Sequence, residues 1–204
     1  GWFIDDVVIY TCSPTASTTA PPPPSMVTLP LVTRGYTFVG ERTILADGFE
    51  DAFPGAWLAI DSNPADGREY VWAKSACRPG ADASSAWAVG GGTHGSALGC
   101  GAEYPGQIDS WLVYGPFSLE DATSAGLDLR LWLNTVRDQD YVALMASVDG
   151  VYYYGSSMSG NTGGWASFFV DLTPWAGRSD LQLAVAILTD DSVNSGDGYG
   201  GVYI

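Results

Sequence analysis

The sequence predicts an all-β protein, an antiparallel β-sandwich of jelly-roll type, preceded by an extended N-terminal strand and a Pro-rich linker. Short apolar segments rich in β-branched and aromatic residues recur along the chain, separated by turn residues every 8 to 12 positions. No window carries an apolar period of 3.6 residues between a cap and a stop signal, which argues against helices of any length. A content of 26 Gly and 12 Pro supplies the turns that such a fold needs.

The N-terminal part of the chain divides into a strand and a linker. Residues 2–10 are rich in β-branched and aromatic residues, which favours a strand interrupted by one acidic pair. Residues 13–30 contain Pro, Ser and Thr and no charge, which is typical of an extended spacer and of O-glycosylated segments. We therefore expect a strand over 1–12, a linker over 13–34 and the sandwich over 35–204.

Alternation of apolar and polar residues identifies the clearest strand of the body. Four leucines occupy every second position, namely Leu127, Leu129, Leu131 and Leu133. The positions between them are polar except for Trp132, so we expect the leucine face in the core and the other face, with Trp132, in solvent. Similar patterns predict further strands, at 69–75, 111–119, 165–172, 181–188 and 200–204.

A hairpin is expected around Asp149-Gly150. Residues 141–148 and the segment after Gly150 are both strand-like, and an Asp-Gly pair between two strands favours a two-residue type I′ turn.

Charge and composition exclude several classes of function. The chain carries 8 Lys and Arg against 23 Asp and Glu, a net charge of −15, which repels phosphate backbones and anionic lipid heads. No apolar stretch is long enough to be expected to span a membrane. We therefore expect neither a nucleic-acid partner nor a membrane span.

Catalytic motifs are scarce. His94, the one histidine, lies in a glycine-rich segment without a nucleophile elbow, so we interpret it as an ordinary loop residue. Asp138, Asp140, Asp190 and Asp191 could form carboxylate pairs for glycoside hydrolysis, but solvated loop acids explain them equally well. We expect no catalytic residue.

The three cysteines indicate one disulfide. Cys77 and Cys100 are both flanked by turn residues that could bring them together, and a bond between them would imply an oxidising compartment. Cys12 is then left over, as a small buried hydrophobe or as half of an intermolecular disulfide.

The two ends of the chain repeat one pattern. Residues 1–7 read GWFIDDV, and residues 201–204 read GVYI, which is the start of the same strand without its acidic pair. If the closing strand needs the whole pattern, the body lacks its last half strand and residues 1–10 carry a spare one. The alternatives are a strand that folds back onto its own domain and an arbitrary boundary within a longer chain.

Several segments together resemble a known family. They are DGFEDAFPGAW (47–57), SWLVYGPFSLEDATSAGLDLRLWLN (110–134), DYVALMASVDG (140–150), GGW (163–165) and GYGGVYI (198–204). These segments resemble the jelly-roll domains attached to immune inhibitor A-type secreted metallopeptidases and to many bacterial surface proteins. The closing strand of those domains typically reads like residues 1–7 here. A weaker likeness, an opening Phe-Glu and a closing Ile-Asp-Asp, links the chain to MAM adhesion domains.

The resemblance implies a non-catalytic extracellular or cell-surface module of bacterial origin, often with a structural calcium ion. It assigns Glu50 and the pair Asp5 and Asp6 as the first choice of calcium ligands, with Asp61 and Asp66 as the next. The acidic pair stands at the opposite end of the chain from its place in the family.

Two functions are carried forward from the sequence. The first is a structural subunit that assembles head to tail, the N-terminal strand of one copy adding to the sheet of the next, through Trp2, Ile4, Val7, Ile9, Val202 and Ile204. The 18 residues 13–30 of the linker, at about 3.1 Å per residue, would reach roughly 55 Å. The alternative is a carbohydrate-binding or substrate-targeting accessory module of a secreted multidomain protein, in which an exposed Trp132 stacks on a sugar ring. The expected partners are accordingly other copies of the chain or glycans.

Overall fold

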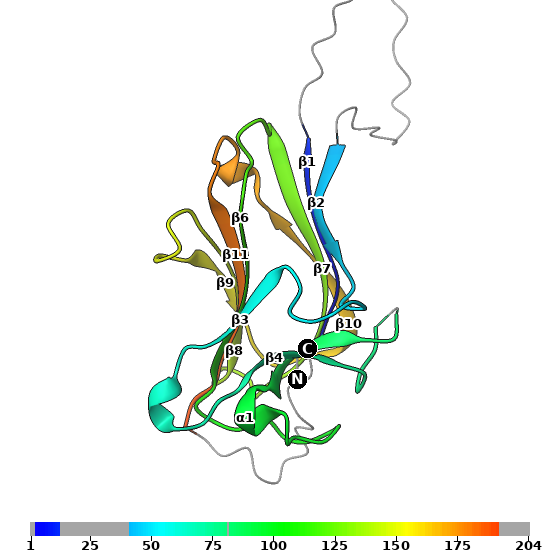
Figure 1. Cartoon of the computed structure of the whole chain (residues 1–204), viewed down its shortest axis with the longest axis vertical. Helices are drawn as coiled ribbons and strands as arrows, with labels where there is room; N and C mark the ends of the chain where they lie inside the picture. The colour runs from blue at the N-terminus through cyan, green and yellow to red at the C-terminus, as the bar shows by residue number, and fades with distance from the viewer. Residues whose placement is uncertain (1–2, 13–40, 81, 192–204) are drawn as a thin grey trace, which may run out of the picture.

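The computed structural model describes residues 3–12, 41–80 and 82–191, which form an all-β sandwich of two antiparallel sheets (Figure 1). The six-stranded sheet has the order β10 (Asn161–Asp171), β7 (Ser124–Asn134), β1 (Phe3–Cys12), β5 (Ser85–Gly91), β4 (Val71–Ser75), with β2 (Glu41–Asp47) also paired to β1. The five-stranded sheet has the order β3 (Trp57–Asp61), β6 (Asp109–Phe117), β11 (Leu181–Leu188), β8 (Tyr141–Ser147), β9 (Tyr154–Met158).

The helices in the described part of the chain are single turns. They are η1 (Pro64–Asp66), α1 (Gly92–Gly95) and η2 (Thr173–Trp175). None of these helices is long and apolar enough to cross a membrane.

The predicted strands of the body are found with shifted ends. Residues 181–188 form β11 as expected, and β6, β10 and β4 lie within a few residues of the segments expected for them. The strands β2, β3 and β5 were not expected from the sequence. The strand expected at 200–204 lies outside the described residues.

Alternation along β7 is confirmed on its inner face. Leu127, Leu129, Leu131 and Leu133 are 6%, 2%, 0% and 3% exposed and pack in the core between the sheets.

The hairpin at Asp149-Gly150 is confirmed, but its expected turn type is wrong. Strands β8 and β9 are paired from Ala146 and Tyr154 onward, so the connection runs over residues 148–153 and is longer than a two-residue turn. Gly150 has a φ of 70°, whereas Asp149 is not among the residues with positive φ that a type I′ turn requires. Instead the Asp149 carboxylate accepts hydrogen bonds from the amides of Val151 and Tyr152, both at 2.8 Å.

Hydrogen bonds join the two sheets through the core. The buried indole Nε1 of Trp72, on β4, donates to the carbonyl of Ser110 on β6 at 3.1 Å. The Ser110 hydroxyl donates in turn to the carbonyl of Ala88, on β5, at 2.8 Å. These bonds satisfy buried polar groups and fix how one sheet lies on the other.

The predicted disulfide between Cys77 and Cys100 is present. It ties the loop after β4 to the loop that precedes β6. Cys12, at the end of β1, is buried and is not in a disulfide, in keeping with the interpretation as a small buried hydrophobe.

Candidate functional site

The first candidate site is the position that β1 occupies in the six-stranded sheet. One edge of β1 is paired with β7 from Phe3 to Cys12. Its other edge is paired with β2 from Val7 to Cys12 and with β5 at Phe3 and Ile4. Strand β1 thus lies in the middle of the sheet and joins β7 and β10 to β2, β5 and β4 (Figure 1). We call this position the β1 slot.

The inward side chains of β1 belong to the core. Val7 is 2% exposed and Ile9 is not exposed at all, whereas Val8, between them, is half-buried on the outer face. Of the other residues expected at a subunit interface, Ile4 lies opposite Ala86 and Leu131 in the backbone register. Trp2, Val202 and Ile204 lie outside the described residues. In this structure the slot is filled by the chain's own strand.

The acidic pair of β1 lies where one edge of the strand changes its partner from β5 to β2. The pairing with β7 shifts between Asp5 and Val7, a β-bulge that leaves Asp6 out of the register. The pairing of β1 with β5 ends at Ile4 and Ala86, near the start of β5. There the amide of Ser84 donates to Glu50 Oε1 at 2.6 Å. That Asp5, Asp6 and Glu50 hold one calcium ion stays a prediction.

Glu50 keeps acceptor capacity at this place. Its Oε1 accepts one bond, and no hydrogen bond to its Oε2 is found among the described residues. The nearby ammonium of Lys74 donates to the carbonyls of Glu50 and Asp51, so a protein cation already holds this loop. The carboxylate at position 50 fits a hard cation, and calcium there stays a prediction.

Asp61 and Asp66, the second choice of metal ligands, are engaged in turns. Asp61 accepts from the amides of Asn63 and Tyr70, at 2.9 and 3.4 Å. Asp66 accepts from the Arg68 amide at 2.8 Å and forms an ion pair with the Arg68 guanidinium, also at 2.8 Å. The hydrogen bond from that amide is the main reason why the pKa of Asp66 lies below its ordinary value. Among the described residues, no three His, Cys, Asp or Glu side chains gather to hold a metal ion.

The residues considered for catalysis have structural partners. His94 Nδ1 accepts a hydrogen bond from the Glu69 amide at 3.1 Å, which docks α1 onto the start of β4. Asp140 is 1% exposed. Its carboxylate accepts from the Tyr104 hydroxyl and, at 3.0 Å, from the Asp190 amide. Asp140 therefore fixes the chain at the end of β11.

The second candidate site is the outer face of the five-stranded sheet. Leu181, Leu183, Val185 and Ile187 pack in the core, so alternation turns Gln182, Ala184 and Ala186 of β11 outward. On this outer face Trp111 of β6 is half-buried and pairs in register with Ile60 of β3. The ring of Tyr153 meets Trp111 edge-on at 5.2 Å between centroids. We call Trp111, Tyr153 and Ile60 the aromatic platform.

Hydrogen bonds hold both rings of the aromatic platform. The Trp111 indole Nε1 donates to Asp109 Oδ1 at 2.5 Å, and the Tyr153 hydroxyl donates to Gln182 Oε1 at 2.8 Å. Partial burial, and next the negative charge of Asp149, raises the pKa of Tyr153. The amides of Tyr152 and Val151 lower the pKa of Asp149, so the connection that carries Tyr153 rests on an ionised carboxylate at neutral pH.

The expectation that Trp132 is exposed is wrong. Its position in the alternation does turn it away from the inner face, yet it is only 9% exposed. The Arg78 guanidinium lies over its ring, 3.8 Å from the centroid. Arg78 follows directly after Cys77, so the disulfide-tied loop brings this cover into place. Trp111, which alternation did not single out, is a tryptophan that lies half-open on the outer face of the five-stranded sheet.

Comparison with known proteins gives no match. No protein-family model, no curated protein and no solved structure matches the chain.

Proposed function

We propose that the protein is a non-catalytic extracellular structural subunit whose copies assemble head to tail by exchanging β1. The strand of one copy would enter the β1 slot of the next and make the same contacts that it makes with its own sheet. What supports this is the slot itself, which has bonding strands on both sides and a core that accepts Val7 and Ile9. Exchange of an identical element creates an interface without any new surface.

The connection between β1 and β2 is the observation that favours exchange. Cys12, where β1 ends, is the direct register partner of Glu41, where β2 begins. When the strand stays in its own sheet, residues 13–40 must therefore return to the place they left. Their composition, rich in Pro, Ser and Thr, favours extended chain, which resists such a return. Donation to a neighbour removes this conflict and lets the linker bridge two copies.

A head-to-tail contact of this kind leaves a free strand at one end and a free slot at the other. It therefore grows into an open filament unless its rotation closes a ring. Because every copy carries a net charge of −15, repulsion opposes growth at low salt. Calcium bound by Glu50 next to the acidic pair of β1 would reduce that repulsion at the joint, and it is part of this proposal. A secreted, bacterial surface location and the jelly-roll family follow from the resemblance and stay proposals as well.

Sedimentation velocity over a range of concentrations tests assembly. We expect the full chain to form species heavier than a monomer as concentration rises, since fold-back is unimolecular and exchange is not. A chain without residues 1–12 should stop growing, and chelation with EDTA should shift the full chain toward shorter species. A full chain that stays monomeric at every concentration, with and without calcium, would contradict the proposal.

Carbohydrate binding is the second candidate function, and the aromatic platform favours it. A half-open indole fixed by Asp109, with the Tyr153 ring beside it, presents apolar surface to which a sugar ring can stack. Gln182 and Ser157, on the same face, offer polar groups for the hydroxyls of a sugar.

Replacement of Trp111 tests this second function. In affinity electrophoresis against soluble glucans, xylan and chitin oligosaccharides, we expect Trp111→Ala to weaken binding about tenfold, because the stacking surface is lost. Phe169→Ala removes a ring that is 59% exposed on the other sheet and should leave binding unchanged. Retention by no glycan, or equal losses in both variants, would exclude the platform as a sugar site.

A further inference from the structure

A pocket lies between the two sheets, next to the strands β9 and β10. Among the described strands, β9 is paired only with β8, and β10 only with β7. Residues of both edge strands line the pocket, which has a volume of about 360 Å³. That volume falls at the lower end of the range found for small-molecule sites.

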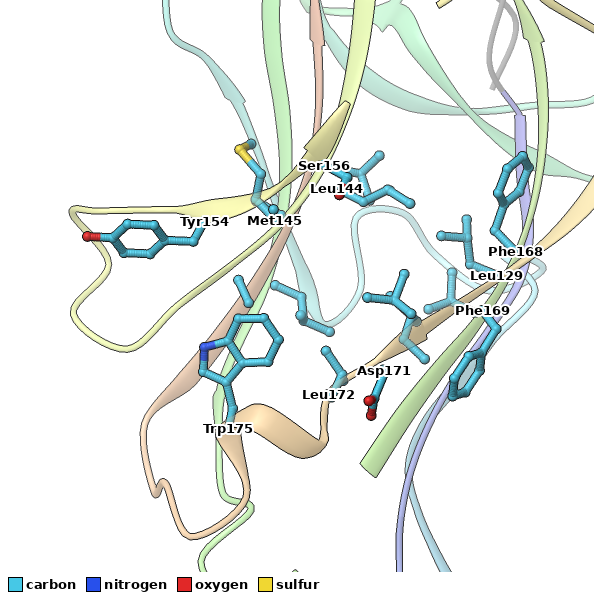
Figure 2. A pocket seen from close by; sticks show the side chains of 18 of the residues that line it. Leu129, Leu144, Met145, Tyr154, Ser156, Phe168, Phe169, Asp171, Leu172 and Trp175 are labelled. Atoms are coloured by element: carbon cyan, nitrogen blue, oxygen red, sulfur yellow. The ribbon is translucent and has the colours of Figure 1, made fainter. Parts of the chain in front are cut away.

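The walls of the pocket are apolar and come from both sheets. Figure 2 shows Leu144 on the side of β8 and β9, and Leu129 and Phe168 across from it on β7 and β10. Leu172 and Trp175, at η2, close the same space from below. Water inside such walls lacks the two to four polar partners that an ordered water needs, so an apolar group is the better occupant.

One charged side chain lines the pocket. Asp171, at the end of β10, is exposed and lies close to Leu172 and Phe169 (Figure 2). Its Oδ1 accepts from the Thr173 amide at 2.9 Å. Hydrogen bonds from Thr173, first from its side chain and then from its amide, hold the pKa of Asp171 below its ordinary value. Asp171 is the one charged residue, and there is no Lys, Arg or His, among the described residues that line the pocket.

An apolar pocket beside a charged residue suits an amphiphile, and the charge near the pocket decides which head group fits. An anionic head, such as that of a fatty acid, would meet the Asp171 carboxylate and a chain of net charge −15. A cationic head is attracted by both, and the rings of Phe169 and Trp175 offer faces on which an ammonium can rest.

We propose that this pocket binds a single-chain cationic amphiphile, with its alkyl chain between the sheets and its ammonium group beside Asp171. The size of the pocket suits one short chain rather than a two-chain lipid. The proposal does not depend on strand exchange, because the walls are the same whichever copy supplies β1.

Isothermal titration of the full chain with alkylammonium probes, below their micelle concentrations, tests the proposal. We expect decylammonium to bind, with an affinity that falls about fourfold for each methylene removed, as burial of an alkyl chain requires. Decanoate, which has a chain of similar length and the opposite charge, should bind at least tenfold more weakly. Asp171→Asn should weaken decylammonium about fivefold, in the range of an exposed ion pair. Asp180→Asn, at an exposed carboxylate paired with Arg178, should change nothing.

The variant Ala146→Leu distinguishes binding inside the pocket from adsorption of the probe to the protein surface. Ala146 is 2% exposed on β8 and lines the pocket, so a larger side chain fills the space and should abolish binding while the thermal midpoint is kept or raised. Three results would overturn the proposal. They are no binding of decylammonium, equal binding of decanoate, and undiminished binding by a folded Ala146→Leu variant.

Discussion

Ile9→Ala will lower the free energy of unfolding by about 3 kcal/mol, the middle of the range for removing a large buried aliphatic side chain. The side chain of Ile9 is fully buried in the core between the sheets. Its strand carries backbone pairing on both edges, so the cavity cannot close by a shift of β1 alone. Urea unfolding, followed by tryptophan fluorescence, measures the loss.

Val8→Ala is the matched control, since Val8 is half-buried on the outer face of the same strand. It should cost less than about 1 kcal/mol. Comparable losses at positions 8 and 9 would mean that β1 does not lie in the slot with this orientation. The comparison holds whether β1 comes from the same copy or from a neighbour, because the contacts are the same in both cases.

Removing the disulfide has the second largest expected effect. Replacing both Cys77 and Cys100 with Ser should cost about 3 kcal/mol, because a sequence separation of 23 residues is no longer closed in the unfolded chain. The fluorescence of Trp132 should also shift to the red, since the loop that carries Arg78 over its ring is released. Thermal unfolding and emission spectra measure the two effects.

Cys12→Ser is the control for this experiment, because Cys12 is not in a disulfide. It should leave the emission of Trp132 unchanged. A double variant as stable as the parent chain would show that the loop is held by its other contacts and that the bond adds nothing.

Alternation predicted the inner faces of strands well and the outer faces poorly. The leucines of β7 are buried as expected, because one face of a strand in a sandwich must meet the other sheet. Whether the opposite face is open depends on loops that come from elsewhere in the chain. Trp132 has the outward phase but is covered by Arg78, a residue far away in sequence.

For the same reason, the aromatic platform could not be predicted from the sequence. Trp111 lies among residues that are apolar on both phases of β6, so no period identifies which side faces the solvent. Strand β5 was missed for a related reason, because Ser85 to Val89 are buried throughout and show no alternation. The disulfide could be predicted because its two cysteines lie in turn-rich segments.

The inter-sheet pocket had no sequence signal. Many of its walls are apolar residues that alternation assigns to the core, and the spacing between the sheets near β9 and β10 leaves room among them. Spacing of this kind depends on the packing of many side chains at once. In the sequence, Asp171 is an acidic residue at the end of a strand, and only the fold places it beside the pocket.

A cross-linking experiment tests strand exchange most directly. Val8 and Asp128 are register partners on β1 and β7, and both side chains face outward, so cysteines at these positions meet across the strands at a distance that allows a disulfide. The variant carries Val8→Cys, Asp128→Cys and Cys12→Ser, and it is oxidised at high protein concentration and run on a denaturing gel without reductant. We expect a ladder of covalent multimers that collapses to monomer on reduction. A single band of internally cross-linked monomer would show that β1 stays in its own sheet and would contradict strand exchange.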